Sequence, residues 1–302
     1  MSKVIKMTEM VNPHFYKLWT TKKSYIIAKG GRGSFKSSVI SLKLVTSVKK
    51  WTQLHKKVNV VCILANKSDL HDTVYSQIMW ALDMLNLNDE YNYYKSPLRI
   101  THKLTGSTFY FYGADNPHKL KSNKVDNIIA VWFEEAANMK GVDVFDQSIP
   151  SFIRQKPDYV DDVKVYFSYN PPRNPYEWIN DWVTAREEDP EYFVDTSTYL
   201  DDELGFTTEQ QLKLIESYKN NDYDYYRWLY LGEVIGLGTN IYNMDNFKVL
   251  KELPNDDYIT NWFCAIDSGH EVSATTFGAY GLTRKGNVIL LDTYYYSPQG
   301  KA

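Results

Sequence analysis

The hydrophobic residues of this chain form short continuous runs that are separated by stripes at helical spacing. Continuous apolar runs of this kind are typical of strands that are buried on both faces of a parallel sheet. Helical stripes follow the first two runs, at 36–45 and 68–85, and a hairpin is predicted at 98–101 and 107–112. The runs lie at 25–28, 58–65, 127–133 and 163–168. Because strands alternate with helices, the pattern predicts a mainly parallel sheet covered by helices on both faces.

The pattern changes after Asn174. A short helix at 175–182, a strand at 192–199 and two polar helices between 207 and 230, broken near 220–221, are predicted there. Glycines at 232, 236 and 238 then indicate a hinge. Strands at 262–266, 274–280 and 287–294 begin a second β-containing domain, and we expect the chain to end inside it, because too few residues remain to bury a core.

A glycine-rich turn separates the first predicted strand from the first helix, and we expect it to bind a nucleotide. Glycines let backbone N–H groups approach phosphate oxygens, and a helix N-terminus favours negative charge. Lys36 would reach the β- and γ-phosphates, and the Ser37 hydroxyl would bind Mg²⁺. The predicted binding residues are Gly30, Gly31, Arg32, Gly33, Ser34, Phe35, Lys36, Ser37 and Ser38. Phe35 departs from the pattern G-x-x-x-x-G-K-[ST], which has glycine there, and the alternative is an ordinary strand–helix connection.

Polar side chains follow the last two of the apolar runs predicted as buried strands. Glu134 and Glu135 follow the run at 128–133, where Glu134 would hold the Mg²⁺ sphere through water and Glu135 would deprotonate the attacking water. Asn170 follows the run at 163–168 and could hydrogen-bond phosphate. The alternatives are a solvated strand end for the two glutamates and a simple Asn-Pro-Pro turn for Asn170. Arg32 would stabilise the transferred phosphoryl group or merely pair with a carboxylate.

Composition limits the other possibilities. The chain has 34 Lys and Arg against 37 Asp and Glu, so no overall basic field indicates nucleic acid. Lys119, Lys121 and Lys124 could serve DNA, a neighbouring subunit's nucleotide or only solubility. Cys62 and Cys264 lie in apolar runs, which predicts buried free thiols in a reducing compartment. Neither a membrane span nor a signal sequence is recognisable, which favours a cytosolic protein.

Asp267 follows a predicted strand and precedes Ser268-Gly269. A carboxylate at the tip of a first strand is how ribonuclease-H-like folds begin a site for two metal ions. Asp-Ser-Gly is also a good turn, so the two interpretations stay open.

These motifs, in this order, resemble the large subunit of tailed-phage terminases. The segments that carry the resemblance are Gly30-Gly-Arg-Gly-Ser-Phe-Lys-Ser37, Val131-Trp-Phe-Glu-Glu-Ala136, Phe167-Ser-Tyr-Asn-Pro171, Tyr199-Leu-Asp-Asp202, Tyr230-Leu-Gly232 and Ala265-Ile-Asp-Ser-Gly269. The resemblance implies an α/β fold of the P-loop (ASCE) type in residues 1–180. It further implies a linker subdomain at 181–245 and the beginning of a ribonuclease-H-like nuclease domain at 246–302.

The resemblance also implies the function. Such a protein hydrolyses ATP with Mg²⁺ to move double-stranded viral DNA into a procapsid, and its nuclease, with Mg²⁺ or Mn²⁺ at Asp267, cuts concatemeric DNA. The implied partners are DNA, a portal protein, a small terminase subunit and further copies of the chain in a ring. The implied location is the host cytoplasm, without a membrane, and the mature virion lacks the protein.

Two departures from the family pattern matter. The family often has a trans-acting arginine shortly before the glutamate strand, where this chain has only lysines; Arg32, Arg154 or a lysine would have to replace it. The nuclease also needs acidic residues well beyond Asp267. The rival hypotheses are a helicase-like ATPase, which would need a second motor domain, and a degenerate nucleotide-binding scaffold without DNA-stimulated ATP hydrolysis.

Overall fold

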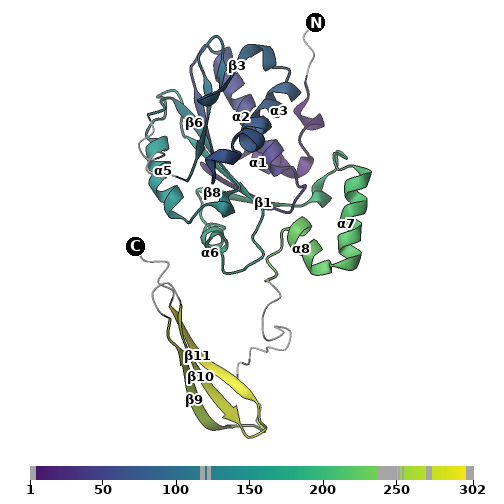
Figure 1. Cartoon of the computed structure of the whole chain (residues 1–302), viewed down its shortest axis with the longest axis vertical. Helices are drawn as coiled ribbons and strands as arrows, with labels where there is room; N and C mark the ends of the chain where they lie inside the picture. Colours follow the sequence, from purple (N-terminus) through teal and green to yellow (C-terminus); the bar gives the residue numbers. More distant parts are fainter. Residues whose placement is uncertain are drawn as a thin grey trace. The chain divides into compact units, whose positions relative to one another are not determined.

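The computed structural model describes residues 5–115, 120, 124–236, 250, 252–253, 255–269 and 274–296. The chain divides into two compact units, Met1–Thr239 and Asn240–Ala302, and each is described by itself (Figure 1). The finer division that we expected at residues 180 and 245 stays a prediction.

The first unit is built on an eight-stranded sheet with the order β3-β4-β5-β2-β6-β7-β1-β8. Its strands are β1 (Tyr25–Gly30), β2 (Asn59–Leu64), β3 (Tyr91–Lys95), β4 (Leu98–His102), β5 (Thr108–Gly113), β6 (Ile128–Glu134), β7 (Lys164–Tyr169) and β8 (Tyr192–Ser197). The six neighbouring strands β5, β2, β6, β7, β1 and β8 run parallel to one another. Strand β4 runs antiparallel to both of its neighbours, β3 and β5. The prediction of a mainly parallel sheet is confirmed.

Alternate residues of the central strands enter two different cores. Ala28 and Cys62 point into one core, and their neighbours Ile27 and Val61 point into the other. Helices α2 (Lys36–Gln53) and α3 (Ser76–Met84) supply the first core, while α5 (Asp143–Ile153) and α6 (Trp178–Thr184) supply the second. Helices therefore cover both faces of the sheet, as Figure 1 shows.

Several elements differ from the sequence-based expectation, among them the short helix α1 (Tyr16–Thr20), which was not predicted. The predicted helix at 68–85 begins as a 3₁₀ turn, Lys67–Asp69, and a π-helical turn, His71–Tyr75, before α3. Strand β3 was not predicted, because it lies at the sheet edge and is exposed except for Tyr91. Helix α5 was missed because it contains Pro150, which ordinarily indicates a break.

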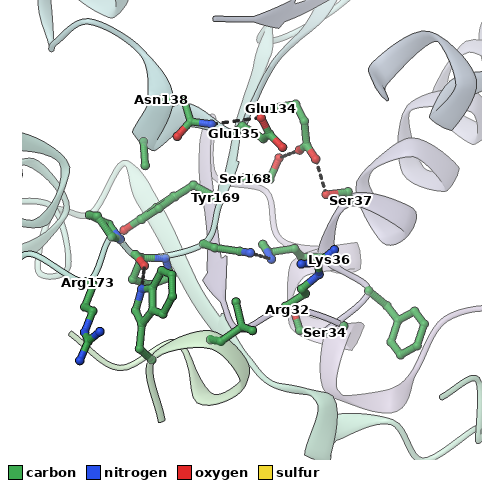
Figure 2. A pocket seen from close by; sticks show the side chains of 18 of the residues that line it. Arg32, Ser34, Lys36, Ser37, Glu134, Glu135, Asn138, Ser168, Tyr169 and Arg173 are labelled. Atoms are coloured by element: carbon green, nitrogen blue, oxygen red, sulfur yellow. Dashed lines mark hydrogen bonds between the residues drawn. The ribbon is translucent and has the colours of Figure 1, made fainter. Parts of the chain in front are cut away.

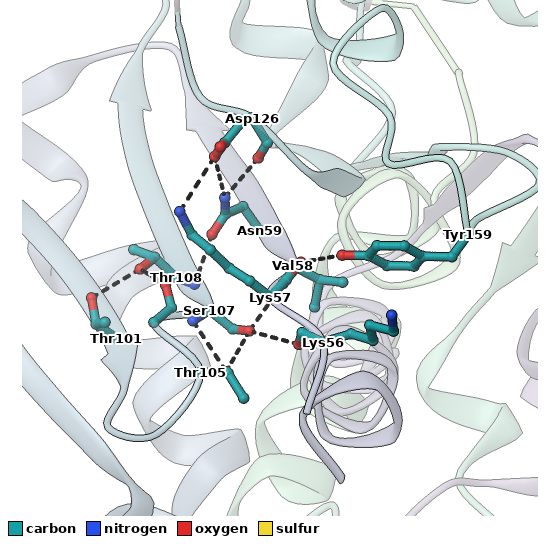
Figure 3. A network of polar contacts seen from close by, with 11 residues as sticks. Lys56, Lys57, Val58, Asn59, Thr101, Thr105, Ser107, Thr108, Asp126 and Tyr159 are labelled. Atoms are coloured by element: carbon teal, nitrogen blue, oxygen red, sulfur yellow. Dashed lines mark hydrogen bonds and ion pairs between the residues drawn. The ribbon is translucent and has the colours of Figure 1, made fainter. Parts of the chain in front are cut away.

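A polar network holds the first residues of β2 in place, where this central strand begins (Figure 3). The Asn59 side chain donates to the Asp126 carbonyl at 2.6 Å and accepts from the Thr108 N–H at 2.9 Å. The Ser107 hydroxyl accepts from the Val58 N–H at 3.0 Å. These contacts set the register of β2 against β5 and hold the chain that enters β6.

A small helical segment follows β8. It contains a 3₁₀ turn (Tyr199–Asp201), α7 (Glu209–Asn221) and α8 (Tyr223–Leu231), so the two helices predicted here are present. Tyrosines supply much of their contact, with Tyr226 and Tyr230 buried against Tyr199. The tyrosine-rich composition thus builds a small core of its own.

The second unit contains a three-stranded antiparallel sheet with the order β11-β10-β9. Its strands are β9 (Ile259–Asp267), β10 (Thr275–Thr283) and β11 (Val288–Tyr296). Cys264 is exposed on β9, so the expectation that it is buried was wrong, whereas Cys62 is buried. The apolar run around Cys264 indicated a strand correctly. Among the described residues of this unit, however, few side chains cover this strand, and it is largely exposed.

Some expectations fall on undescribed residues, namely the glycine at 238 and the lysines at 119 and 121. Among the described residues, no helix combines the length and the apolar character needed to cross a membrane.

Candidate active site

A pocket of about 770 Å³ lies where β1, β6 and β7 end and α2 begins (Figure 2). These three strands are neighbours in the sheet, and ligands of open α/β sheets bind at the carboxyl ends of the strands. The pocket brings together side chains that the sequence placed far apart. Those predicted as site residues are Arg32, Gly33, Ser34, Phe35, Lys36, Ser37, Ser38, Glu134, Glu135 and Asn170.

The first two glycines of the turn allow close contact with protein carbonyls. A Cβ at Gly30 would lie 1.9 Å from the Ser197 oxygen, and one at Gly31 would lie 1.9 Å from the Tyr230 oxygen. The Gly31 N–H donates to Ser197 O at 3.0 Å, and the Arg32 N–H donates to Leu229 O at 2.7 Å. These N–H groups therefore bind the end of β8 and α8, whereas the sequence had suggested that they face phosphate.

Phe35 adopts the left-handed backbone conformation, with φ 63° and ψ 9°. This conformation costs a residue other than glycine about 1–2 kcal/mol, which explains why the pattern has glycine here. The Phe35 ring packs edge-on against Phe206 with the ring centroids 5.6 Å apart. The turn therefore keeps the backbone that a glycine would give it, and the side chain packs beside the pocket.

Lys36 opens helix α2 and is 8% exposed. Its ammonium group donates to the Asn170 side-chain oxygen and, at 3.4 Å, to the carbonyls of Gly30 and Gly31. Burial lowers the pKa of Lys36 to about 8, although the charge of Glu134 opposes this shift. A poorly solvated ammonium at a helix N-terminus is suited to bind an anion.

Glu134 is held by two hydroxyl groups. Its Oε1 accepts from Ser37 Oγ at 2.6 Å and its Oε2 accepts from Ser168 Oγ (Figure 2). Burial raises the pKa of Glu134, while the hydrogen bonds from Ser168 and Ser37 and the charge of Lys36 oppose the increase. The Ser168 hydroxyl also accepts from Trp132 Nε1 at 2.6 Å. Ser168 was not predicted as a site residue, although a serine inside a buried apolar run was a usable signal.

Glu135 is exposed at the edge of the pocket and has a left-handed backbone, with φ 51° and ψ 46°. Its Oε2 accepts from Asn138 Nδ2 at 3.1 Å. Strained residues of this kind concentrate at functional sites. The turn separates two adjacent glutamates, so that Glu134 points to Ser37 and Glu135 to Asn138 (Figure 2).

The segment after β7 is tied to α8 and the residues that follow this helix. Trp228 Nε1 donates to Pro171 O at 3.0 Å, and Arg173 Nε donates to Gly236 O at 2.9 Å. Because α8 also accepts from the Arg32 N–H, it contacts both the glycine-rich turn and the segment that carries Asn170. These contacts were not predicted, since they join segments separated by more than fifty residues.

Two predicted residues lie elsewhere. Arg154 lines a separate surface pocket beside Tyr25 and Lys156. Asp267 is exposed at the end of β9, in the second unit. A nuclease role for Asp267 stays a prediction. Among the described residues, no group of three or more His, Cys, Asp and Glu side chains could hold a metal ion.

The pocket fits a magnesium ion that shares its coordination with a substrate. The Ser37 hydroxyl and the Glu134 carboxylate are hard oxygen ligands, and they lie 2.6 Å apart. Magnesium in phosphate-transferring sites is usually held by one or two such groups, with phosphate oxygens and water completing the octahedron. Ser37 and Glu134 are therefore the residues that would hold Mg²⁺.

Known proteins are similar to this chain in sequence and in fold. The family model described as phage terminase large subunit matches residues 22–233. The large terminase subunit of Bacillus phage SPP1 is 29% identical over 243 residues, which cover 78% of this chain and 56% of that protein. The PBSX phage terminase large subunit of Bacillus subtilis strain 168 is 32% identical over 132 residues, 43% of this chain and 28% of that protein. The chain thus spans about half, or less, of these relatives.

Solved structures agree at the level of fold. The large terminase of a thermophilic bacteriophage superposes with a TM-score of 0.58 at 19% identity, covering 95% of this chain and 69% of that one. The same protein in complex with ATP-γ-S gives a TM-score of 0.56 at 20% identity, covering 95% and 68%. The HK97 bacteriophage large terminase gives 0.57 at 9% identity, covering 98% and 64%.

Proposed function

Because the chain belongs to the phage terminase large-subunit family, we propose that it is the ATP-hydrolysing motor subunit that moves double-stranded viral DNA into a procapsid. One observation carries the proposal: Lys36 hydrogen-bonds to Asn170 and Ser37 to Glu134 within a single pocket at the carboxyl ends of adjacent strands. Phosphoryl transfer depends chiefly on positioning and on electrostatic stabilisation, and this cluster provides both.

In this proposal the triphosphate binds at the N-terminus of α2, with the Lys36 ammonium on its β- and γ-phosphates. Bound Mg²⁺ would neutralise charge that develops on the phosphate oxygens. Ser37 and Glu134 are placed to hold it. Arg32 is exposed at the pocket and is available to the transferred phosphoryl group.

Glu135 is the proposed general base. Unlike Glu134, it makes no hydrogen bond to the serines of the pocket among the described residues, and its side chain accepts from the amide of Asn138. An exposed carboxylate at the pocket rim can accept a proton from the attacking water and pass it to solvent.

Asn170 is the proposed reporter of the γ-phosphate. Its side-chain oxygen accepts from Lys36 Nζ, so a γ-phosphate at Lys36 competes for the same donor. Asn170 lies directly before Pro171, whose carbonyl accepts from Trp228 on α8. Loss of the γ-phosphate would therefore alter the contact of Asn170, and the next residue along the chain, Pro171, is hydrogen-bonded to α8.

The motor is proposed to act as a ring of identical subunits on a portal protein, together with a small terminase subunit. Its DNA contacts would be mainly to phosphates, which makes translocation salt-sensitive and largely independent of sequence. The nuclease activity is proposed for the complete protein, with Asp267 as one metal ligand.

Packaging in vitro tests the proposal. Purified protein is mixed with procapsids that carry portal, the small subunit, ATP and linear DNA, and DNase-protected DNA is measured. Lys36→Ala serves as the inactive variant and Lys140→Ala, at an exposed lysine outside the pocket, as the control. We expect protection with wild type and Lys140→Ala only. DNA-stimulated ATP hydrolysis that is indifferent to procapsids would favour the helicase-like rival, and the absence of ATP hydrolysis would favour the scaffold.

A further inference from the structure

Strands β3, β4 and β5 carry a row of flat side chains on one face of the sheet. On their other face, Ile100, Phe109 and Phe111 pack into the core that α2 and α3 supply. Because side chains alternate along a strand, the intervening residues point to the opposite face. These are Asn92 and Tyr94 of β3, Arg99 and Thr101 of β4, and Thr108, Tyr110 and Tyr112 of β5. The proposed function does not use this surface, which we call the tyrosine–arginine face.

Tyr94, Arg99 and Tyr110 lie side by side across the three strands. Tyr94 is the partner of Arg99 in the β3–β4 pairing, and Arg99 is the partner of Tyr110 in the β4–β5 pairing. The Arg99 guanidinium lies over the Tyr94 ring, 4.4 Å from its centroid. Tyr94 is 37% exposed, and Arg99 and Tyr110 are partly exposed. Planar groups therefore follow one another inward from the edge strand β3.

Arg99 supplies a positive charge that no carboxylate neutralises. Among the described residues it forms no ion pair, and its Nε is buried without a hydrogen-bond partner. In contrast, the Thr101 and Thr108 hydroxyls on the same face are hydrogen-bonded to each other at 3.0 Å (Figure 3). Neither Asp nor Glu occupies any position of the tyrosine–arginine face. A stacked guanidinium without an acidic partner is suited to bind an anion such as phosphate.

Aromatic rings beside an unpaired arginine are a combination that binds single-stranded nucleic acid. Rings stack on bases of any sequence, and a guanidinium binds phosphate. Sheets that bind single-stranded RNA present aromatic side chains to the bases in a similar way. The bases of a duplex are stacked on each other and leave no open face for a ring. The tyrosine–arginine face therefore suits an unpaired strand better than a duplex.

We propose that the tyrosine–arginine face binds single-stranded nucleic acid, with bases stacked on Tyr94 and Tyr110 and a phosphate at Arg99. This inference goes beyond the proposed function, in which the DNA is double-stranded and is contacted through its phosphates. It is also independent of the nucleotide pocket, which these three residues do not line.

Binding of labelled oligonucleotides to the whole chain tests the proposal. Fluorescence anisotropy gives the dissociation constants of oligothymidylate, of an abasic oligomer of the same length and of a duplex of that length. The variants are Tyr94→Ala, Tyr94→Phe and Tyr93→Ala. Tyr93 is the matched control, because it precedes Tyr94 on β3, is 36% exposed and points to the opposite face. Circular dichroism checks that each variant is folded.

Stacking on Tyr94 has a specific signature. Tyr94→Ala should bind oligothymidylate about tenfold more weakly and should bind the abasic oligomer and the duplex as wild type does. Tyr94→Phe keeps the ring and should keep the affinity, and Tyr93→Ala should leave all three ligands unchanged. The proposal is wrong if wild type does not bind oligothymidylate, if Tyr94→Ala weakens none or all of the ligands, or if Tyr93→Ala has the same effect as Tyr94→Ala.

The salt dependence of binding tests the phosphate contact at Arg99. Arg99→Ala should lower the slope of log affinity against log salt concentration by about 0.7, because one phosphate contact is lost, whereas Arg99→Lys should keep the slope. An equal slope in wild type and Arg99→Ala would contradict the contact. Excess ATP with Mg²⁺ should not displace oligothymidylate. Displacement would place the oligomer in the nucleotide pocket and overturn the proposal.

Discussion

Ser168 lies between a buried indole and a half-buried carboxylate, and removing its hydroxyl should cost more than removing an ordinary buried hydroxyl. The hydroxyl accepts from Trp132 Nε1 at 2.6 Å and donates to Glu134 Oε2, and neither Ser168 nor Trp132 is exposed. A hydrogen bond to a charged group contributes about 1.5–3 kcal/mol, and a buried donor without a partner costs about 1–3 kcal/mol. We therefore expect Ser168→Ala to lower the free energy of unfolding by about 3–5 kcal/mol.

A double-mutant cycle with Trp132→Phe separates the two contributions. Phenylalanine has no N–H, so in that background Ser168→Ala loses only the contact with Glu134, and its cost should fall by about 1–2 kcal/mol. Urea unfolding followed by circular dichroism measures all four proteins. Ser148→Ala is the control, because Ser148 is fully buried but donates only to the Val144 carbonyl within its own helix. A cost below that of Ser148→Ala, or equal costs in both backgrounds, would refute the reasoning.

Three further predictions concern the glycine-rich turn, Lys36 and the cysteines. Gly31→Ala places a Cβ 1.9 Å from Tyr230 O, so α8 must move away and hydrogen exchange of the amides at residues 228–231 should accelerate. Gly141→Ala is the control, because the space around its Cβ is open and exchange at residues 228–231 should not change. The pKa of Lys36 is about 8, and bound phosphate favours the charged form of this side chain. The affinity for ATP should therefore fall as the pH rises from 8 to 10, by up to about tenfold per pH unit. A constant affinity over this range, measured by calorimetry, would contradict the role of the ammonium group. The exposed Cys264 should react with a thiol reagent in the folded protein, whereas Cys62 should not, because Cys62 is buried and burial raises the pKa of its thiol. Mass spectrometry that finds both cysteines modified would contradict the burial of Cys62.

Local patterns predicted most of the sheet, because its central strands are buried on both faces and appear as continuous apolar runs. Strand β2 has every residue buried and was recognised directly. Strand β3 carries exposed polar residues along an edge, and helix α5 contains Pro150, so neither has the pattern that defines its class. The exposure of Cys264 could not be predicted, because strand periodicity does not specify what covers a face.

The candidate site was predictable to the extent that its residues follow strands or begin a helix. Lys36, Glu134 and Asn170 were each predicted to contact the phosphates or the Mg²⁺ of a nucleotide, and the structure places them in one pocket. Ser168 and Trp228 were missed. Their contacts depend on side-chain directions and on the path of α8, which comes back to the turn from far along the chain.

Single-turnover ATP hydrolysis by Glu135→Gln tests the central claim most directly. The substitution keeps the size of the side chain and an oxygen that can accept from Asn138, but removes the basic carboxylate. Nucleotide affinity should remain close to that of wild type, while the hydrolysis rate should fall by about 10²–10⁴-fold. Hydrolysis at the wild-type rate would contradict the assignment of Glu135 as the base in this pocket.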